Sequence, residues 1–445
     1  MKSSFGFVAI IFGLFFCLSA EASAGVELGL QVDKPLVYCE RNERIVLQIN
    51  LEADAIPAEI PRYPINLSVI LDKSGSMRGR KLEDAKSAAI EAIHHLDQGD
   101  IFSLIVFDSH PRVLIPATPL ANLTSTSKII RSLEAGGSTA LYDGLKLGDS
   151  ELRRYGASKL MPRIILLSDG LANVGPSRPS DLNALGRQLV REGITISTVG
   201  LGLDYNEDLM TSLASISDGN AYFAANSKQL PEIFAEELGD ATTLAARNLR
   251  LQVAFPEGIT PRQVLGRNGT IRGQDVEIEL KNLYSSGSKS ILIEAEIPGG
   301  KPGQISPLAK VTLKYQDLLS NQHSERGELI TFIHTQNEEE VAQNLNQEVL
   351  KAVTLTKISL EKDRAISLAD AGEYAAAATV MNDNYLLLKK NYALCGNDSE
   401  LRLEAENCLA IGKNIARNQG LSNYERKRLR NEIYIDINQQ RYEAR

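Results

Sequence analysis

The chain has 445 residues and a formal net charge of −8. Its length predicts two or three domains, because a single hydrophobic core rarely grows beyond about 300 residues. The acidic balance argues against nucleic-acid binding, which requires a concentrated basic surface. A basic cluster at residues 424–432 alternates with acidic residues and is interpreted as the solvated face of a helix.

Residues 1–24 have the features of a secretory signal peptide: an early lysine, an apolar stretch and a final small-residue run, ASA. The apolar stretch is shorter than the roughly 20 residues that a membrane-spanning helix needs, which favours cleavage over an uncleaved anchor. Cys17 follows a bulky phenylalanine, which disfavours lipid attachment there. We therefore expect a mature chain that begins at Gly25, has no membrane span, and is secreted or resides in the periplasm or cell envelope.

Cleavage would leave three cysteines, Cys39, Cys395 and Cys408. Cys395 and Cys408 flank a short polar turn, so an oxidising compartment favours a disulfide between them. Cys39 would then be unpaired, and we expect it to be a buried thiol.

Residues 25–60 form an N-terminal β segment in this interpretation. Strand-like alternation is present in "VELGLQVDKPLVY" and "RIVLQINLEA", and the proline-rich "AIPAEIPRYP" that follows predicts a linker.

The pattern changes over residues 64–246, where strand and helix candidates alternate strictly. The strand candidates are "INLSVIL", "IFSLIVF", "RIILLS", "ITISTVGLG" and "AYFAA". The helix candidates include "KLEDAKSAAIEAIHHL", "ALYDGLKLGDSELRR", "DLNALGRQLVREG", "EDLMTSLASIS" and "PEIFAEELGDATTLAAR". This alternation predicts an α/β domain with a doubly wound, mostly parallel sheet.

Alternating strands return over residues 247–320, and residues 337–445 are predicted to be a C-terminal helical region. We expect the two β regions to pair into one β-sandwich, with the α/β domain inserted between them. One helical-hairpin motif, "LADAGEYAAAATVM", does not make a solenoid, so the helical region is interpreted as a small bundle.

The stretch "INLSVILDKSGSM" is a buried-strand pattern that ends in Asp72, Ser74 and Ser76. Alternate residues of an extended chain point the same way, so these three oxygen-bearing side chains are predicted to face one spot. That spot lies beyond the carboxyl end of a strand, where open α/β sheets usually bind ligands.

Two further loops are predicted to reach the same edge of the sheet. One is "EAGGSTALYDGL", which contains Thr139, and the other is "IILLSDGLANVG", which contains Asp169. Each loop alone has a structural explanation as a helix cap or a turn. Together with Asp72 and the two serines, they make an all-oxygen set that suits Mg²⁺, Mn²⁺ or Ca²⁺ rather than Zn²⁺.

The motifs "DKSGSM", "GGSTALYDGL" and "LLSDG", in this order, resemble the metal-ion-dependent adhesion site of von Willebrand factor type A (VWA) domains, and the wider chain resembles bacterial secreted proteins with such a domain. The resemblance implies a Rossmann-like VWA fold and a divalent ion, Mg²⁺ or else Mn²⁺ or Ca²⁺. It also implies a protein partner that offers an acidic side chain to the ion. The implied metal ligands are Asp72, Ser74, Ser76, Thr139 and Asp169. A shift of one position would place Ser138 in the role of Thr139.

Three functions remain open from the sequence. The favoured one is a non-enzymatic binding module that holds a partner through the metal. A metal-assisted hydrolase would need a general base such as Asp108 or Asp143, and the sequence has no GxSxG, HExxH or P-loop motif. Asp108 also follows a strand end and is interpreted as a turn residue rather than a carboxylate near the metal. The third function is a cell-envelope scaffold without metal-dependent binding.

Overall fold

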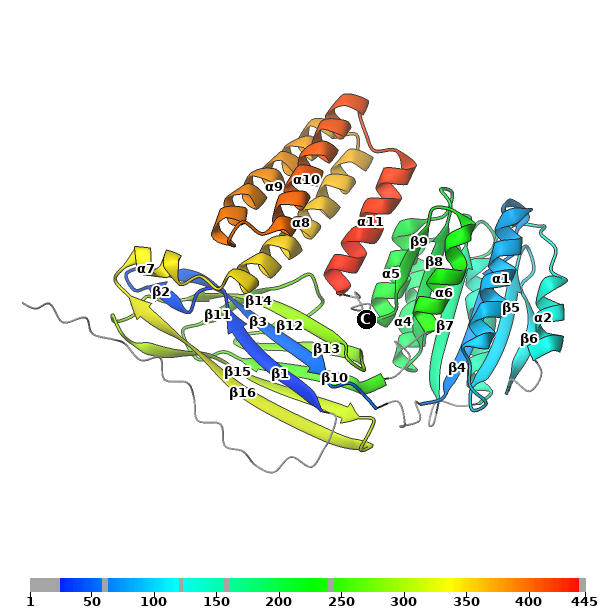
Figure 1. Ribbon diagram of the computed structural model, residues 1–445, viewed down its shortest axis with the longest axis horizontal. Coiled ribbons are helices and arrows are strands. Elements are labelled where there is room, and N and C mark those ends of the chain that lie inside the picture. The colour runs from blue at the N-terminus through cyan, green and yellow to red at the C-terminus, as the bar shows by residue number, and fades with distance from the viewer. Residues whose placement is uncertain (1–24, 58–62, 120–122, 156–159, 239–243, 440–445) are drawn as a thin grey trace, which may run out of the picture.

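The computed structural model describes most of the chain and shows three β-sheets together with a helical region (Figure 1). The described residues are 25–57, 63–119, 123–155, 160–238 and 244–439. The predicted signal peptide, residues 1–24, lies outside them. Within the described residues, none of the helices combines the length and the apolar character needed to cross a bilayer.

The α/β domain contains a six-stranded sheet in the order β6-β5-β4-β7-β8-β9. Its strands are β4 (Ile65–Asp72), β5 (Ile101–Phe107), β6 (Arg112–Pro119), β7 (Met161–Ser168), β8 (Thr195–Leu201) and β9 (Ala221–Ala224). All neighbours are parallel except β6, which pairs antiparallel with β5. The doubly wound, mostly parallel sheet is thus confirmed. The edge strand β6 was not predicted, because its residues are mostly outside the core.

Helices cover both faces of this sheet (Figure 1). They are α1 (Arg80–His94), α2 (Leu123–Arg131), α3 (Leu141–Arg153), α4 (Pro179–Arg191), α5 (Glu207–Ser217) and α6 (Leu230–Leu238). In β4, Leu67 and Val69 pack in the core with α1 and α6, whereas Ile70 packs in the core with α3, α4 and α5. Both faces are buried, which explains the unbroken apolar run of this strand. The predicted last helix of the domain was too long, because α6 ends at Leu238 and a strand begins at Leu244.

The remaining two sheets form the β-sandwich. The first has the order β1-β3-β14-β11, and the second β12-β13-β10-β15-β16-β2. The bounds are β1 (Val26–Val32), β2 (Leu36–Tyr38), β3 (Glu43–Ala53), β10 (Leu244–Ala254), β11 (Thr260–Leu265), β12 (Thr270–Arg272), β13 (Asp275–Tyr284), β14 (Ser288–Ile297), β15 (Ile305–Asp317) and β16 (Gln322–Thr335). Inward-facing side chains of both sheets form one core.

The antiparallel pairing of β3 with β14 joins the segment before the α/β domain to the segment after it. The α/β domain is therefore inserted in a sandwich, as expected. Residues 26–38 had been expected to extend as one strand, but the bend at Pro35 sends β1 and β2 to different sheets. Strand β16 was missed because nearly all of its residues are exposed or half-buried, so it lacks a buried apolar face.

The C-terminal region is helical: α7 (Glu338–Gln343), α8 (Gln347–Asp370), α9 (Tyr374–Leu394), α10 (Ser399–Asn418) and α11 (Asn423–Asn438). Helices α8 to α11 share an apolar core. The region contacts both other parts of the molecule. Val349 and Val353 of α8 pack on Val46 and Leu292 of the first sandwich sheet. Helix α11 runs beside α5 and β9 of the α/β domain (Figure 1).

The basic cluster at residues 424–432 is not a solvated face, so that interpretation was wrong. Lys427 is only 4% exposed, and its ammonium donates to Glu207 Oε2 at 2.5 Å. Arg426 also pairs with Glu207, and Arg430 pairs with Asp208 at 3.0 Å. These cations dock α11 against the first turn of α5. Their partners on α5 lie more than 200 positions earlier in the sequence, so a local charge pattern could not reveal them.

The expected disulfide is also absent: Cys395 and Cys408 are both buried free thiols. Cys395 follows the last residue of α9, and its thiol donates to the carbonyl oxygen of Gln347 at 3.5 Å. Cys408 lies in the middle of α10, about 14 Å along the helix axis from Ser399 at the usual rise per residue. This helix separates the two sulfurs. Cys39 is buried and free, as predicted.

Candidate functional site

The three oxygen-bearing loops meet at the carboxyl edge of the α/β sheet. Asp72 is the last residue of β4 and Ser168 the last of the adjacent parallel strand β7, so the loops after them begin side by side. Backbone hydrogen bonds join the first loop to the second, from Gly75 N to Gly137 O at 3.0 Å and from Gly136 N to Lys73 O at 2.9 Å. The sheet and these bonds hold the loops in place.

The second loop requires a glycine at position 137. Its φ of +80° lies in the left-handed region. A Cβ at this position would lie 3.0 Å from Ser109 Oγ and 3.1 Å from Asp108 Cβ. A side chain there would push the second loop away from the neighbouring loop.

The predicted ligand residues of the first and third loops touch one another. Ser74 Oγ and Ser76 Oγ are 3.0 Å apart, and Ser76 Oγ donates to Asp169 Oδ1 at 2.7 Å. Asp72 accepts from the backbone N–H of Ser74 at 2.8 Å and from Ser168 Oγ at 2.6 Å. Both carboxylates are fully buried. The structure thus brings together four of the five residues named from the sequence.

Thr139 completes the group from the second loop. Its backbone N–H donates to Asn173 Oδ1 at 2.8 Å, which ties it to the loop after β7. A Cβ built on Gly170 would lie 3.5 Å from Thr139 Oγ1 and 3.7 Å from Ser76 Oγ. Gly170 therefore leaves open the space that both hydroxyls border.

The donor set fits a hard divalent cation. The five residues offer carboxylate and hydroxyl oxygens only, and two carboxylates balance the charge of one divalent ion. Among the residues that the structure describes, no three His, Cys, Asp or Glu side chains stand close enough to hold a metal on their own. A metal at this edge would therefore depend on the serine and threonine hydroxyls. That these side chains are the ligands remains a prediction.

Burial controls the charge on Asp72. It raises the pKa of Asp72 to about 6, against an ordinary value of 3.8, and the hydrogen bonds from Ser168 and Ser74 oppose this rise. The nearby carboxylate of Asp169 adds to it. Burial thus disfavours the charged form of Asp72, and a nearby cation would favour it.

Two lysines at this edge were not singled out from the sequence. Lys81, in the first turn of α1, donates to Asp169 Oδ2 at 2.6 Å. Lys73 is 7% exposed and pairs with Asp108. The available signal was position alone: Lys73 directly follows Asp72, and Lys81 lies in the first turn of the helix that starts at the same edge.

Asp108 is a turn residue, as interpreted. It accepts from the backbone N–H of His110 at 2.8 Å and from Lys73. Burial works to raise the pKa of Asp108, but these hydrogen bonds outweigh it and lower the pKa. Asp108 is thus committed to Lys73 and to its own turn.

Residues 66–236 match the family model of the von Willebrand factor type A domain. This segment is a VWA domain by sequence as well as by fold. The first relative is an uncharacterised protein of Synechocystis, 26% identical over 337 residues that cover 72% of this chain and 77% of that protein. Human inter-alpha-trypsin inhibitor heavy chain H3 is 31% identical over 174 residues, 37% of this chain but only 19% of the heavy chain.

The fold recurs in a solved structure that covers most of the chain. A von Willebrand factor type A protein from Catenulispora acidiphila superimposes with a TM-score of 0.67 at 17% identity. The match covers 86% of this chain and 90% of that one. At this identity the likeness concerns the fold alone.

Proposed function

We propose that this protein is an exported, non-enzymatic binding module that holds a protein partner through a divalent ion at the carboxyl edge of its VWA domain. One observation carries the proposal: the hydroxyls of Ser76 and Thr139, from two loops, border the space that Gly170 leaves open, and Ser76 contacts both Ser74 and Asp169. VWA domains commonly mediate protein–protein interaction and often bind a divalent metal, which supports the assignment.

The five residues would contribute two kinds of ligand to the ion. Asp72 and Asp169 would supply the negative charge, and the hydroxyls of Ser74, Ser76 and Thr139 would supply neutral oxygens. Mg²⁺ usually takes six oxygen ligands, so five side chains leave at least one position for a carboxylate from a partner. An acidic side chain on the partner surface is the feature that this edge would recognise.

The scaffold function has one specific observation in its favour. Lys81 already pairs with Asp169, so part of the charge at this edge is balanced without a metal. A domain that keeps this pair would use the loops as structural turns only. Of the two candidate general bases for a hydrolase, Asp108 is committed to Lys73, which counts against its use as a base.

Titration calorimetry with Mg²⁺ separates these functions. Asp72→Ala and Asp169→Ala should each abolish Mg²⁺ binding while leaving the domain folded, because the loops sit at the end of a rigid sheet. Asp181→Ala is a matched control, since Asp181 is a carboxylate in the first turn of α4 whose partners are the exposed Arg178, at 3.2 Å, and the hydroxyl of its neighbour Ser180, at 3.5 Å.

Partner capture from extracellular or periplasmic extract, with and without chelator, then tests the role of the ion. Metal-dependent binding requires that capture by the wild type fail in chelator and that capture by both aspartate variants fail in Mg²⁺. Undiminished Mg²⁺ binding to both variants, or capture indifferent to chelator, would favour the scaffold.

A further inference from the structure

Strand β16 has an open edge over most of its length. One side of the strand pairs with β15 from Gln322 onward. Among the described residues, the other side pairs only with β2, which covers Ile333 to Thr335. Residues 322–332 therefore form an open edge of the second sandwich sheet, longer than an average strand of roughly five or six residues. Leu329 of this edge is 63% exposed, and a partner strand would shield part of it from water.

The hydrogen bonds at the end of β16 show which backbone groups point to the open edge. Ile333 N–H donates to Pro35 O at 3.0 Å on the side of β2, whereas His334 N–H donates to Gln304 O at 3.0 Å on the side of β15. The backbone groups of successive strand residues point to opposite sides. The register shift between β15 and β16 adds its extra residue to β15, so this alternation continues along β16. The odd-numbered residues of β16 thus direct their N–H and C=O groups to the open edge.

The open edge is self-complementary in charge. Gly327 stands between Arg326 and Glu328, and all three residues are exposed. Among the described residues, neither charged side chain has an ion-pair partner within the chain. If a second copy pairs antiparallel with Gly327 opposite Gly327, Arg326 of each copy lies opposite Glu328 of the other. Opposite charges directly across an antiparallel pair stabilise it, and like charges destabilise it.

The backbone geometry fits the same register. Gly327 is odd-numbered, so the two glycines would exchange both of their backbone hydrogen bonds. Arg326 and Glu328 would then form the pair without backbone hydrogen bonds, in which the Cα atoms are about 4.5 Å apart and the side chains are closest. The adjacent two-fold registers place Arg326 opposite Arg326 or Glu328 opposite Glu328. Charge therefore selects the register centred on Gly327.

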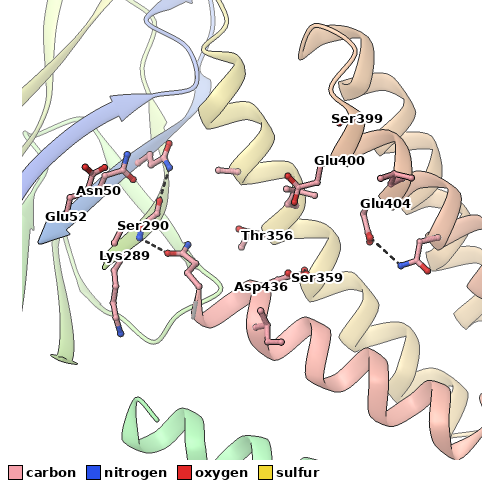
Figure 2. Close-up of a pocket in the computed structure, with 18 residues that line it drawn as sticks. Asn50, Glu52, Lys289, Ser290, Thr356, Ser359, Ser399, Glu400, Glu404 and Asp436 are labelled. Carbon is pink, nitrogen blue, oxygen red and sulfur yellow. Dashed lines mark hydrogen bonds between the residues drawn. The ribbon is translucent and has the colours of Figure 1, made fainter. Parts of the chain in front are cut away.

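The open edge lies away from the contacts that join the three parts of the molecule. The helical region covers the first sheet, where Ser290 N–H donates to Gln439 Oε1 at 2.6 Å (Figure 2). The second sheet meets the VWA domain at β13, where Lys281 Nζ donates to Val190 O at 3.2 Å. Strands β10 and β15 separate β13 from β16, and β16 lies on the side of the sandwich away from helices α8 to α10 (Figure 1). A second copy can therefore approach this edge without displacing either contact.

We propose that two copies of this chain dimerise by antiparallel pairing of their β16 strands about Gly327. The second sandwich sheets of the two copies would then form one continuous sheet, and the dimer would have two-fold symmetry, with the same edge used by both copies. The VWA domain takes no part in this pairing. The dimer would therefore present two carboxyl edges, which favours binding to partners that carry more than one acidic site.

Sedimentation equilibrium of the full chain, from micromolar to about millimolar concentration, tests the proposal. We expect a reversible equilibrium between monomer and dimer. Arg326→Glu and Glu328→Arg should each raise the dimer Kd roughly tenfold or more, because each change turns two attractive pairs into two repulsive ones. An equimolar mixture of the two variants should dimerise about as tightly as the wild type, because every charge then faces its opposite again. This recovery excludes misfolding as the cause of the losses.

Arg272→Glu is the matched control. It makes the same change of charge at an exposed position on β12, at the opposite edge of the same sheet, and should leave the dimer Kd unchanged. Thermal melting confirms that each variant is folded. A wild type that stays monomeric throughout would overturn the proposal and leave the edge to a strand of another protein. A mixture that dimerises no better than either variant alone, or a dimer that all of these proteins form equally well, would overturn it too.

Discussion

Replacing Lys81 with methionine should strengthen Mg²⁺ binding at the carboxyl edge. The Lys81 ammonium lies 2.6 Å from Asp169 Oδ2, and that carboxylate is fully buried. A divalent ion held by Asp169 would have to share its charge with this ammonium or displace it. Methionine keeps much of the aliphatic stem of lysine and removes the competing charge.

The expected gain follows from the charge separation and the exposure of the lysine. Two unit charges at roughly 4 Å, in an effective dielectric of about 20, interact by about 4 kcal/mol. Lys81 is 33% exposed, so its ammonium can turn toward solvent and avoid much of this repulsion. We therefore expect a gain of about 1–2 kcal/mol, which is roughly a 5- to 30-fold lower Kd for Mg²⁺.

Calorimetry at fixed ionic strength measures this Kd directly. Lys128→Met is the control, because it removes the same charge from an exposed position on α2 of the same domain. An unchanged Kd in the Lys81 variant would show that the ammonium does not compete with the ion. Weaker Mg²⁺ binding would show instead that Lys81 holds Asp169 in the geometry that binding needs.

Three further predictions concern the rest of the molecule. Lys427→Met should lower the free energy of unfolding by up to about 3 kcal/mol in denaturant titrations, because Glu207 would then keep only Arg426. Burial raises the pKa of Asp33 from 3.8 to about 6, so the stabilising effect of its protonated form is full below pH 3.8 and is lost as the pH rises through 6. Near pH 4, Asp33→Asn and the wild type should therefore have equal free energies of unfolding. At pH 7 the variant should be the more stable of the two, by no more than about 3 kcal/mol. A fragment of residues 62–246 should melt cooperatively by circular dichroism, whereas residues 246–445 should not, because that piece lacks β3.

The parts of the fold with strong local patterns were predictable. Strand β4 is buried over its whole length, so its continuous apolar run predicted a central parallel strand without knowledge of its neighbours. The convergence at the carboxyl edge followed from the same pattern, because the ends of parallel strands meet at one edge. Asp72 and Asp169 could therefore be assigned to one site from sequence alone.

Features that depend on tertiary contact were not predictable. Strand β16 pairs with β15 and β2 but exposes most of its side chains, so no alternation of apolar residues marks it. The contact of Lys81 with Asp169 joins the start of α1 to the loop after β7, and no spacing in the sequence encodes it. We had predicted a disulfide between Cys395 and Cys408. Helix α10 keeps their sulfurs apart, and the number of residues between them gave no sign of this helix.

The basic residues of α11 show why a charge pattern alone is ambiguous. Glu207 and Asp208 begin α5, where negative charge is favourable because a helix N-terminus carries a partial positive charge. If these acids were exposed to water they would need no ion-pair partner, and exposed alternating charges at residues 424–432 would need none either. The fold sets the two groups against each other, and burial of Lys427 makes the pairing necessary, since a buried ammonium without a carboxylate is strongly unfavourable.

The same contact connects the helical region to the candidate metal edge. Lys427 also donates to the carbonyl oxygen of Tyr205 at 2.6 Å, in the segment that follows β8. That segment starts at the carboxyl edge with Gly202, where a Cβ would lie 3.8 Å from the ammonium of Lys81. One short segment therefore lies beside Lys81 at its start and is bonded to α11 near its end. Because packed segments of this kind resist independent displacement, the position of α11 and the surroundings of Lys81 are structurally linked.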